Sequence, residues 1–151
     1  MAIPNNHQIH LATLLDVDIV ADTERVAAAR LEDKVAPAIY PGQELRLATD
    51  RQVALGRSLS LDLTNDSFRV ASAKIDDELR VRNRTAANDL GLKPGDRAVK
   101  RQRVEINGTC RDLDQEYIVS SVDENFRVWF KGGNGQGAWP TQLEKMAEEA
   151  G

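Results

Sequence analysis

The feature that most constrains the fold is a series of short apolar and polar alternations, separated by turn residues, in the C-terminal part of the chain. Strands are predicted at Arg97–Ile106, Glu116–Val122, Phe126–Phe130 and Ala138–Pro140. Turn residues lie between them at 107–108, 123–125 and 132–137. No helical segment separates these strands, so a barrel suits them better than a parallel sheet covered by helices. We therefore expect residues from about Leu92 to Met146 to form a small, strongly twisted β-barrel.

Four segments of this region resemble, in their spacing, the small barrels of the Src-homology, Tudor and KOW type. They are Pro94–Arg97, Glu116–Asp123, Phe126–Lys131 and Ala138–Leu143, which lie within about a third of the chain. The resemblance implies a small SH3-like barrel that binds nucleic acid, methylated side chains or partner peptides. It does not choose among these ligands, because one fold serves many functions.

A second resemblance concerns residues 79–96. This segment is similar to the strand, short helix and Gly-Asp turn of AbrB-like swapped-hairpin DNA-binding proteins, with Leu90–Asp96 as the best-matching piece. That family usually has proline where Asn83 stands and arginine where Ala87 stands. The resemblance implies DNA binding by an interleaved homodimer.

The chain before this region is predicted to begin with two helices. The apolar face of the first would consist of Ile9, Leu11, Leu14 and Leu15. The second is predicted from Asp22 to Val35, with Asp22 or Thr23 as its N-cap and Pro37 as its stop signal.

The middle of the chain changes to a period of two, which is typical of half-buried strands. A hairpin is predicted from a strand at 57–63, a turn at 64–67 and a strand that resumes at Phe68. A third strand is predicted at Glu78–Asn83, followed by a short helix at Thr85–Leu90.

Together these elements predict an α+β fold with N-terminal helices, a β-rich middle and a C-terminal small SH3-like β-barrel. The expected divisions are a helical and β-rich region at residues 1–91, the barrel at 92–146 and a tail at 147–151.

Composition limits the partners and the location. The formal net charge is −4, so a nucleic-acid or anionic-membrane partner would need a local basic patch. No apolar run approaches the roughly 20 residues that cross a bilayer, and the N-terminus lacks the pattern of a signal peptide. We expect a cytoplasmic protein without a membrane partner. Cys110 is the only cysteine, which excludes an internal disulfide and a multi-cysteine zinc site.

Basic residues gather in one window of this acidic chain. They are Arg80, Arg82, Arg84, Lys93, Arg97, Lys100, Arg101 and Arg103. Arginines at alternate positions of a strand stand about 7 Å apart, close to the spacing of phosphates along a nucleic-acid strand. The predicted strand that holds Arg80, Arg82 and Arg84 is therefore a candidate phosphate-binding ridge. The alternative is a solvated strand face whose arginines pair with nearby carboxylates.

The aromatic strand at 126–131 offers a second candidate contact. Phe126, Val128 and Phe130 would alternate inward and leave Trp129 outward between Arg127 and Lys131. An exposed tryptophan between two cations can stack on a nucleic-acid base or line an aromatic pocket with Tyr117 or Trp139. In the alternative interpretation, Trp129 packs against the N-terminal helices.

No pattern in the sequence assembles a catalytic centre. Gly132–Gly137 lacks the ending of a phosphate-binding P-loop and is expected to be a hairpin loop. His7 and His10 lack a third metal ligand, Glu32–Lys34 falls on a predicted helix, and Cys110 has no base near it in sequence. We expect no cofactor and no metal, and an enzyme is the less favoured class.

The leading hypothesis is a non-enzymatic nucleic-acid-binding protein, with DNA favoured over RNA. Its contacts would be Arg80, Arg82, Arg84, Lys100, Arg101, Arg103, Arg127, Trp129 and Lys131. The alternative is a protein-interaction module or a subunit of a larger assembly, which the acidic pI favours. A small metal-dependent nuclease is a distant third. The first two differ in whether the cations form one uncompensated patch or alternate with carboxylates.

Overall fold

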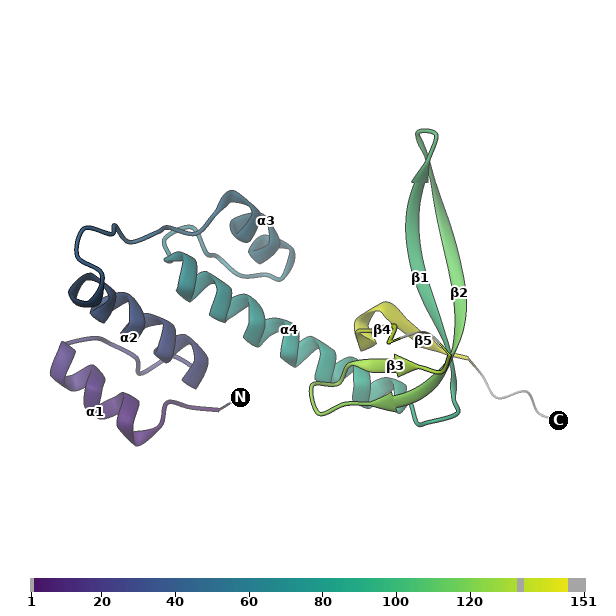
Figure 1. Cartoon of the computed structure of the whole chain (residues 1–151), viewed down its shortest axis with the longest axis horizontal. Coiled ribbons are helices and arrows are strands. Elements are labelled where there is room, and N and C mark those ends of the chain that lie inside the picture. The colour runs from purple at the N-terminus through teal and green to yellow at the C-terminus, as the bar shows by residue number, and fades with distance from the viewer. Residues whose placement is uncertain (1, 133–134, 147–151) are drawn as a thin grey trace. The chain divides into compact units, whose positions relative to one another are not determined.

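The computed structural model describes residues 2–132 and 135–146, with the backbone alone at 102–104 and 112, and the expected tail at 147–151 lies outside this part. The helices are α1 (Asn6–Leu15), α2 (Glu24–Ile39), α3 (Asp50–Ser58) and α4 (Phe68–Leu90). The strands are β1 (Arg97–Ile106), β2 (Thr109–Val122), β3 (Val128–Phe130), β4 (Gly137–Ala138) and β5 (Leu143–Lys145), with a 3-10 turn η1 (Pro140–Gln142) before β5 (Figure 1). The predicted α+β class is confirmed.

The chain divides into two compact units, Met1–Leu79 (unit 1) and Arg80–Gly151 (unit 2). Helix α4 contributes residues to both units. Unit 1 contains α1, α2, α3 and the first half of α4, whereas unit 2 contains the second half of α4 and all of the strands.

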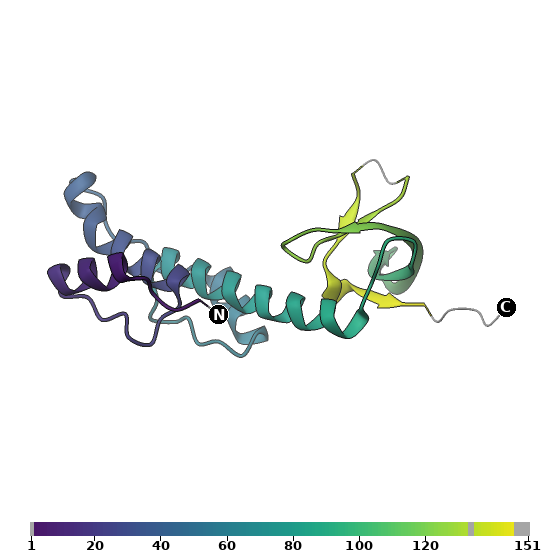
Figure 2. The same cartoon turned by 90° about the horizontal axis from the view of Figure 1, so that it is seen from below.

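The two N-terminal helices are confirmed, with two corrections. Thr23 caps α2 by accepting the Val26 N–H at 3.2 Å, but Pro37 lies inside the last turn and the helix ends at Ile39. Because Pro37 lies in the last turn of α2, the helix loses only one hydrogen bond to it. On α1, which lies alongside α2 in both views (Figures 1 and 2), the buried residue is Ala12, whereas Leu11 and Leu14 of the predicted apolar face are exposed.

The predicted β-rich middle is wrong. Residues 50–58 form α3, whose N-cap Thr49 makes a reciprocal capping box with Gln52. The leucines at 59, 61 and 63, expected to alternate on a strand, lie in the loop after α3, where Leu61 N donates to Gly56 O at 2.7 Å. Leu59 and Leu63 are buried against α4. Their spacing therefore comes from the conformation of the loop and not from a β-strand.

The predicted strands at Phe68 and at 78–83 are also wrong, because both lie on α4. Ser67 accepts the Val70 N–H at 3.1 Å and so begins the helix. Val70 and Ala73 pack against α2, while Ala71 and Ile75 pack against the loop after α3. The buried residues at positions 70, 71, 73 and 75 have helical spacing. The helix that they begin continues through residues 78–83, where a period-two pattern of six residues predicted a strand.

Unit 2 is built on a five-stranded antiparallel sheet in the order β4-β3-β2-β1-β5. The predicted strand at 97–106 is confirmed, and the other three exist with shifted or shortened bounds. Asn107 and Gly108 both have positive φ, 52° and 75°, as a two-residue hairpin turn of this sequence requires. β4 and β5 stand at the two ends of the order, and the described residues form no ladder between them.

The core of unit 2 lies on one face of this sheet. Its buried members are Ala98, Val119, Val128, Phe130, Ala138 and Leu143. Leu90 from the end of α4 and Leu92 pack against them. Gly91, with a φ of 55°, ends the helix by donating its N–H to Ala87 O at 2.9 Å.

The β1–β2 hairpin extends beyond the other strands as a two-stranded arm (Figure 1). β5 pairs with β1 only at 98–100, and β3 pairs with β2 only at 119–122. The ladder between β1 and β2 itself continues to the pair Ile106 and Thr109. A register shift between Val119 and Ser121 marks where β2 passes from the arm into the sheet.

Candidate functional sites

The predicted phosphate-binding ridge does not form. Arg80, Arg82 and Arg84 lie on α4 and not on a strand, so the expected 7 Å spacing does not apply. Arg80 and Arg84 are four residues apart and share one face of the helix, while Arg82 lies on another side. All three side chains are exposed.

The cations of β1 face carboxylates. Arg101 stands opposite Asp114 in the ladder, and Arg103 stands opposite Asp112. Arg101 Nη2 also lies 2.9 Å from Glu144 Oε2 on β5. Lys100 is half-buried, and the side chain of Arg103 lies outside the described part of the chain. Cations of β1 therefore stand beside carboxylates of β2 and β5, which is the arrangement expected of a solvated face.

The aromatic strand forms a compact cation and tryptophan cluster. The Arg127 guanidinium carbon lies 4.9 Å from the ring centroid of Trp129 and 5.3 Å from that of Trp139. Val128 and Phe130 are buried and Trp129 is half-buried, so the predicted alternation is confirmed there. Lys131 is exposed. The chain's own arginine therefore occupies the space beside the two indoles that a ligand cation would need.

Tyr117, the other candidate for this aromatic pocket, does not join it. Its ring stacks on Phe130 with centroids 4.2 Å apart. The indole of Trp139, which is 37% exposed, is the part of the cluster most open to solvent. Packing of Trp129 against the N-terminal helices stays a prediction.

Asp123 holds the cluster in place. Its Oδ1 accepts the backbone N–H groups of Asn125 at 2.9 Å and Arg127 at 3.0 Å, and its Oδ2 accepts the indole N–H of Trp129 at 3.2 Å. Partial burial of this carboxyl group opposes its ionisation, but these hydrogen bonds and the nearby Arg127 charge outweigh it and lower the pKa of Asp123.

Gly137 on β4 makes room for the cluster. A Cβ at this position would lie 2.7 Å from Val128 O, 3.0 Å from Trp129 Cε3 and 3.2 Å from Arg127 Nε. That Nε atom is buried without a hydrogen-bond partner among the described residues. The cluster is thus tightly enclosed on its β4 side.

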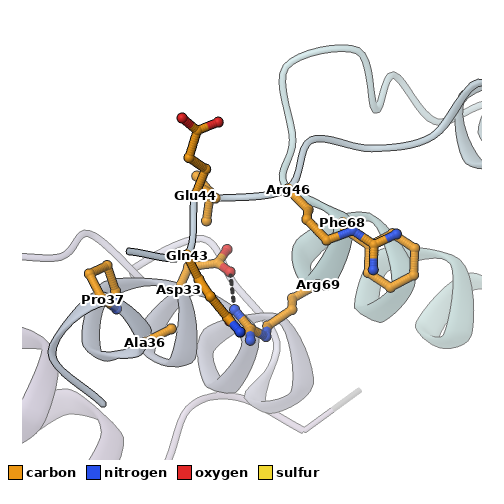
Figure 3. Close-up of a pocket in the computed structure, with 9 residues that line it drawn as sticks. Asp33, Ala36, Pro37, Gln43, Glu44, Arg46, Phe68 and Arg69 are labelled. Atoms are coloured by element: carbon orange, nitrogen blue, oxygen red, sulfur yellow. Dashed lines mark hydrogen bonds and ion pairs between the residues drawn. The ribbon is translucent and has the colours of Figure 1, made fainter. Parts of the chain in front are cut away.

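Unit 1 contains a pocket that the sequence did not reveal. Its volume is about 250 Å³, and it lies between the end of α2, the segment after it and the start of α4 (Figure 3). Its lining residues are Asp33, Ala36, Pro37, Gln43, Glu44, Leu45, Arg46, Phe68 and Arg69. The Arg46 guanidinium carbon lies 4.5 Å from the Phe68 ring centroid.

Asp33 links the helices beside this pocket. Its Oδ1 lies 3.1 Å from Arg69 Nη1 (Figure 3). Its Oδ2 accepts the hydroxyl of Ser67. Ser67 in turn caps α4 through the Val70 N–H. Asp33 therefore positions the pocket wall.

The segment after α2 runs beside the start of α4. Leu47 bridges Ser67 in antiparallel fashion. Ala48 N donates to Asp66 O at 3.0 Å, and Phe68 N donates to Arg46 O at 2.9 Å. Because these bonds come from the neighbours of Leu47, its own N–H and C=O point away from α4. Within the described residues, the backbone groups of Leu45 and Leu47 have no partner.

Large apolar side chains are exposed along the same segment. Ile39, Tyr40, Leu45 and Leu47 are between 54% and 68% exposed. The only signal in the sequence was the alternation of Leu45 and Leu47 after Pro41-Gly42, which does not distinguish a buried strand from an open one.

The described residues hold no group of three His, Cys, Asp or Glu side chains able to bind a metal ion. In the same part of the chain, no helix is long and apolar enough to cross a membrane. Comparison with family models, with curated proteins and with solved structures finds no match to this chain.

Proposed function

We propose that this protein is a non-catalytic protein-interaction subunit that binds a partner protein through unit 1. The observation that carries this proposal is how unit 1 distributes its apolar residues. Among its described residues, five of the twelve buried apolar residues are alanines, at positions 12, 27, 29, 71 and 73, while many large apolar side chains are exposed. The exposed ones include Ile3, Ile9, Leu11, Leu14, Val20, Ile39, Tyr40, Leu45, Leu47 and Leu55.

A single exposed leucine has no special meaning, because much of any protein surface is apolar. Four large apolar residues within the nine of the 39–47 segment, next to a pocket, are more than this background. Contiguous apolar surface of this kind is typical of protein-binding sites.

Charge favours a protein over a nucleic acid as the partner of unit 1. This unit carries 8 Lys and Arg against 13 Asp and Glu, a net charge of −5. A surface of that sign repels phosphates and attracts basic segments.

Affinity purification of the tagged chain from the cells that encode it, with nuclease treatment, tests the proposal. We expect a stoichiometric protein that survives nuclease and is lost when both Leu45 and Leu47 are replaced by serine. The Leu11→Ser, Leu14→Ser double variant changes the same residue type on α1 and compares the two apolar surfaces. Recovery of nucleic acid alone, or of no partner, would reject the proposal.

Nucleic-acid binding by unit 2 is the second candidate, favoured by the Arg127, Trp129 and Trp139 cluster. The exposed face of Trp139 can stack on a base, and Lys131 and the α4 arginines can contact phosphates. Unit 2 carries 12 Lys and Arg against 11 Asp and Glu, so its net charge does not oppose such binding.

Titration of labelled single-stranded DNA and RNA at low salt tests this second candidate. Trp139→Ala should weaken binding about tenfold, since base stacking contributes about 1–3 kcal/mol. Lys34→Ala in unit 1 is the matched surface control. Undetectable binding by the unmodified chain would remove the candidate.

The finer predictions from the sequence remain proposals. A meander of four strands, a 3-10 turn and a fifth strand that returns to β1 support a small SH3-like barrel in unit 2. Homodimer formation and a cytoplasmic location stay predictions. A metal-dependent nuclease gains no support from the site geometry.

A further inference from the structure

The geometry of unit 1 points to the ligand of its pocket: we infer that an extended peptide segment of the partner pairs with the edge at Leu45 and Leu47 and inserts one apolar side chain into the pocket. This inference deepens the proposed function and rests on it. The site is defined as the 45–47 edge together with the pocket lined by Ala36, Pro37 and Phe68.

The edge at Leu45 and Leu47 offers free backbone hydrogen-bonding groups within the described residues. The N–H and C=O of Leu47 point away from α4, and those of Leu45 have no partner within the described residues. An extended chain satisfies such an edge by adding one antiparallel or parallel strand. A helix has no spare backbone groups to offer there, so the edge selects an extended partner.

The pocket is small, and part of its lining is apolar. A volume of about 250 Å³ lies below the roughly 300–1,000 Å³ of small-molecule sites. Ala36, Pro37, Leu45 and Phe68 supply apolar surface, and the Asp33 and Arg69 charges already neutralise each other at 3.1 Å. One apolar side chain fits this apolar surface, because covering it removes apolar area from water.

The charge of unit 1 favours basic residues on either side of the inserted side chain. Unit 1 has a net charge of −5, and Glu44 lines the pocket beside the edge. Lysine or arginine on either side of the apolar residue would therefore be attracted, and acidic flanks repelled.

The test uses a display library of nonapeptides with five random central residues and two lysines at each end, selected on the full chain. We expect enrichment of peptides with a large apolar residue at one fixed position. N-methylation of alternate backbone amides in an enriched peptide should weaken its binding at least tenfold, and glutamate flanks should weaken it most at low salt.

Two α2 variants locate the binding on the protein. Ala36→Leu fills the pocket and should weaken binding at least tenfold, whereas Ala38→Leu makes the same change at an exposed position that does not line the pocket. Both keep good helix formers, and circular dichroism verifies that both fold.

No enrichment, equal binding to both variants, or displacement by a single-stranded oligonucleotide would overturn the inference. The proposed function is judged separately. If Ala36→Leu still retains the stoichiometric protein partner from cells, the site is wrong and the function stands; if the unmodified chain retains none, the function itself fails.

Discussion

The guanidinium carbon of Arg127 lies 4.9 Å from the ring centroid of Trp129, and both residues are held by the Asp123 carboxylate. This arrangement makes an acidic residue the organising centre of an aromatic and cationic cluster. The two tryptophans of the chain both belong to unit 2, so tryptophan fluorescence reports on this unit alone.

Acid should destabilise unit 2 through Asp123. The pKa of this carboxyl group is lowered in the folded state, whereas in the unfolded chain it is about 3.9. Its contribution is therefore complete above pH 4 and is lost as the pH falls from there through the folded-state pKa. Urea unfolding followed by tryptophan fluorescence should show less dependence on pH in Asp123→Asn, which cannot titrate. If the free energy of unfolding below pH 4 depends on pH equally in the unmodified protein and in Asp123→Asn, this role is contradicted.

Gly137→Ala should destabilise unit 2 by about 1–3 kcal/mol, because its Cβ would lie too close to a carbonyl oxygen and to Trp129. The neighbouring Gln136→Ala is the control, since its side chain is exposed and its loss should cost less than about 0.5 kcal/mol. Equal unfolding midpoints for the two variants would show that the cluster can adjust.

Asp33→Ala should destabilise unit 1 by about 1–3 kcal/mol, because it removes the part-buried acceptor of the Ser67 hydroxyl and one of the two carboxylates that contact Arg69. Glu32→Ala is a matched control, since Glu32 contacts the same arginine at 3.5 Å but is 69% exposed. Such a surface pair contributes less than about 1 kcal/mol. Circular dichroism at the helical band measures both, and a larger loss in Glu32→Ala would contradict the assignment.

The sequence predicted unit 2 better than unit 1 for a physical reason. β1 is ten residues long and ends in Asn107-Gly108, whose positive φ angles are those of a two-residue hairpin turn. The leucines at 59, 61 and 63 alternate over a shorter stretch, and there burial against α4 and not strand pairing explains them.

The candidate sites depended on this difference. Trp129 lies on β3, a strand that the sequence predicts with longer bounds, and Arg127 directly precedes β3, so their proximity could be expected. Arg80, Arg82 and Arg84 do not share a face, because they lie on a helix and not on the predicted strand. The pocket of unit 1 joins α2, the 39–47 segment and the start of α4, and no local pattern predicts such a junction.

The most direct test of protein binding by unit 1 is native mass spectrometry of the chain isolated under gentle conditions from the cells that encode it, after nuclease treatment. The account predicts a complex in which the 16.7 kDa chain is accompanied by a second, different polypeptide. Replacing Leu45 and Leu47 with serine should release that polypeptide. A mass equal to the chain alone, or to whole multiples of it, would contradict the account.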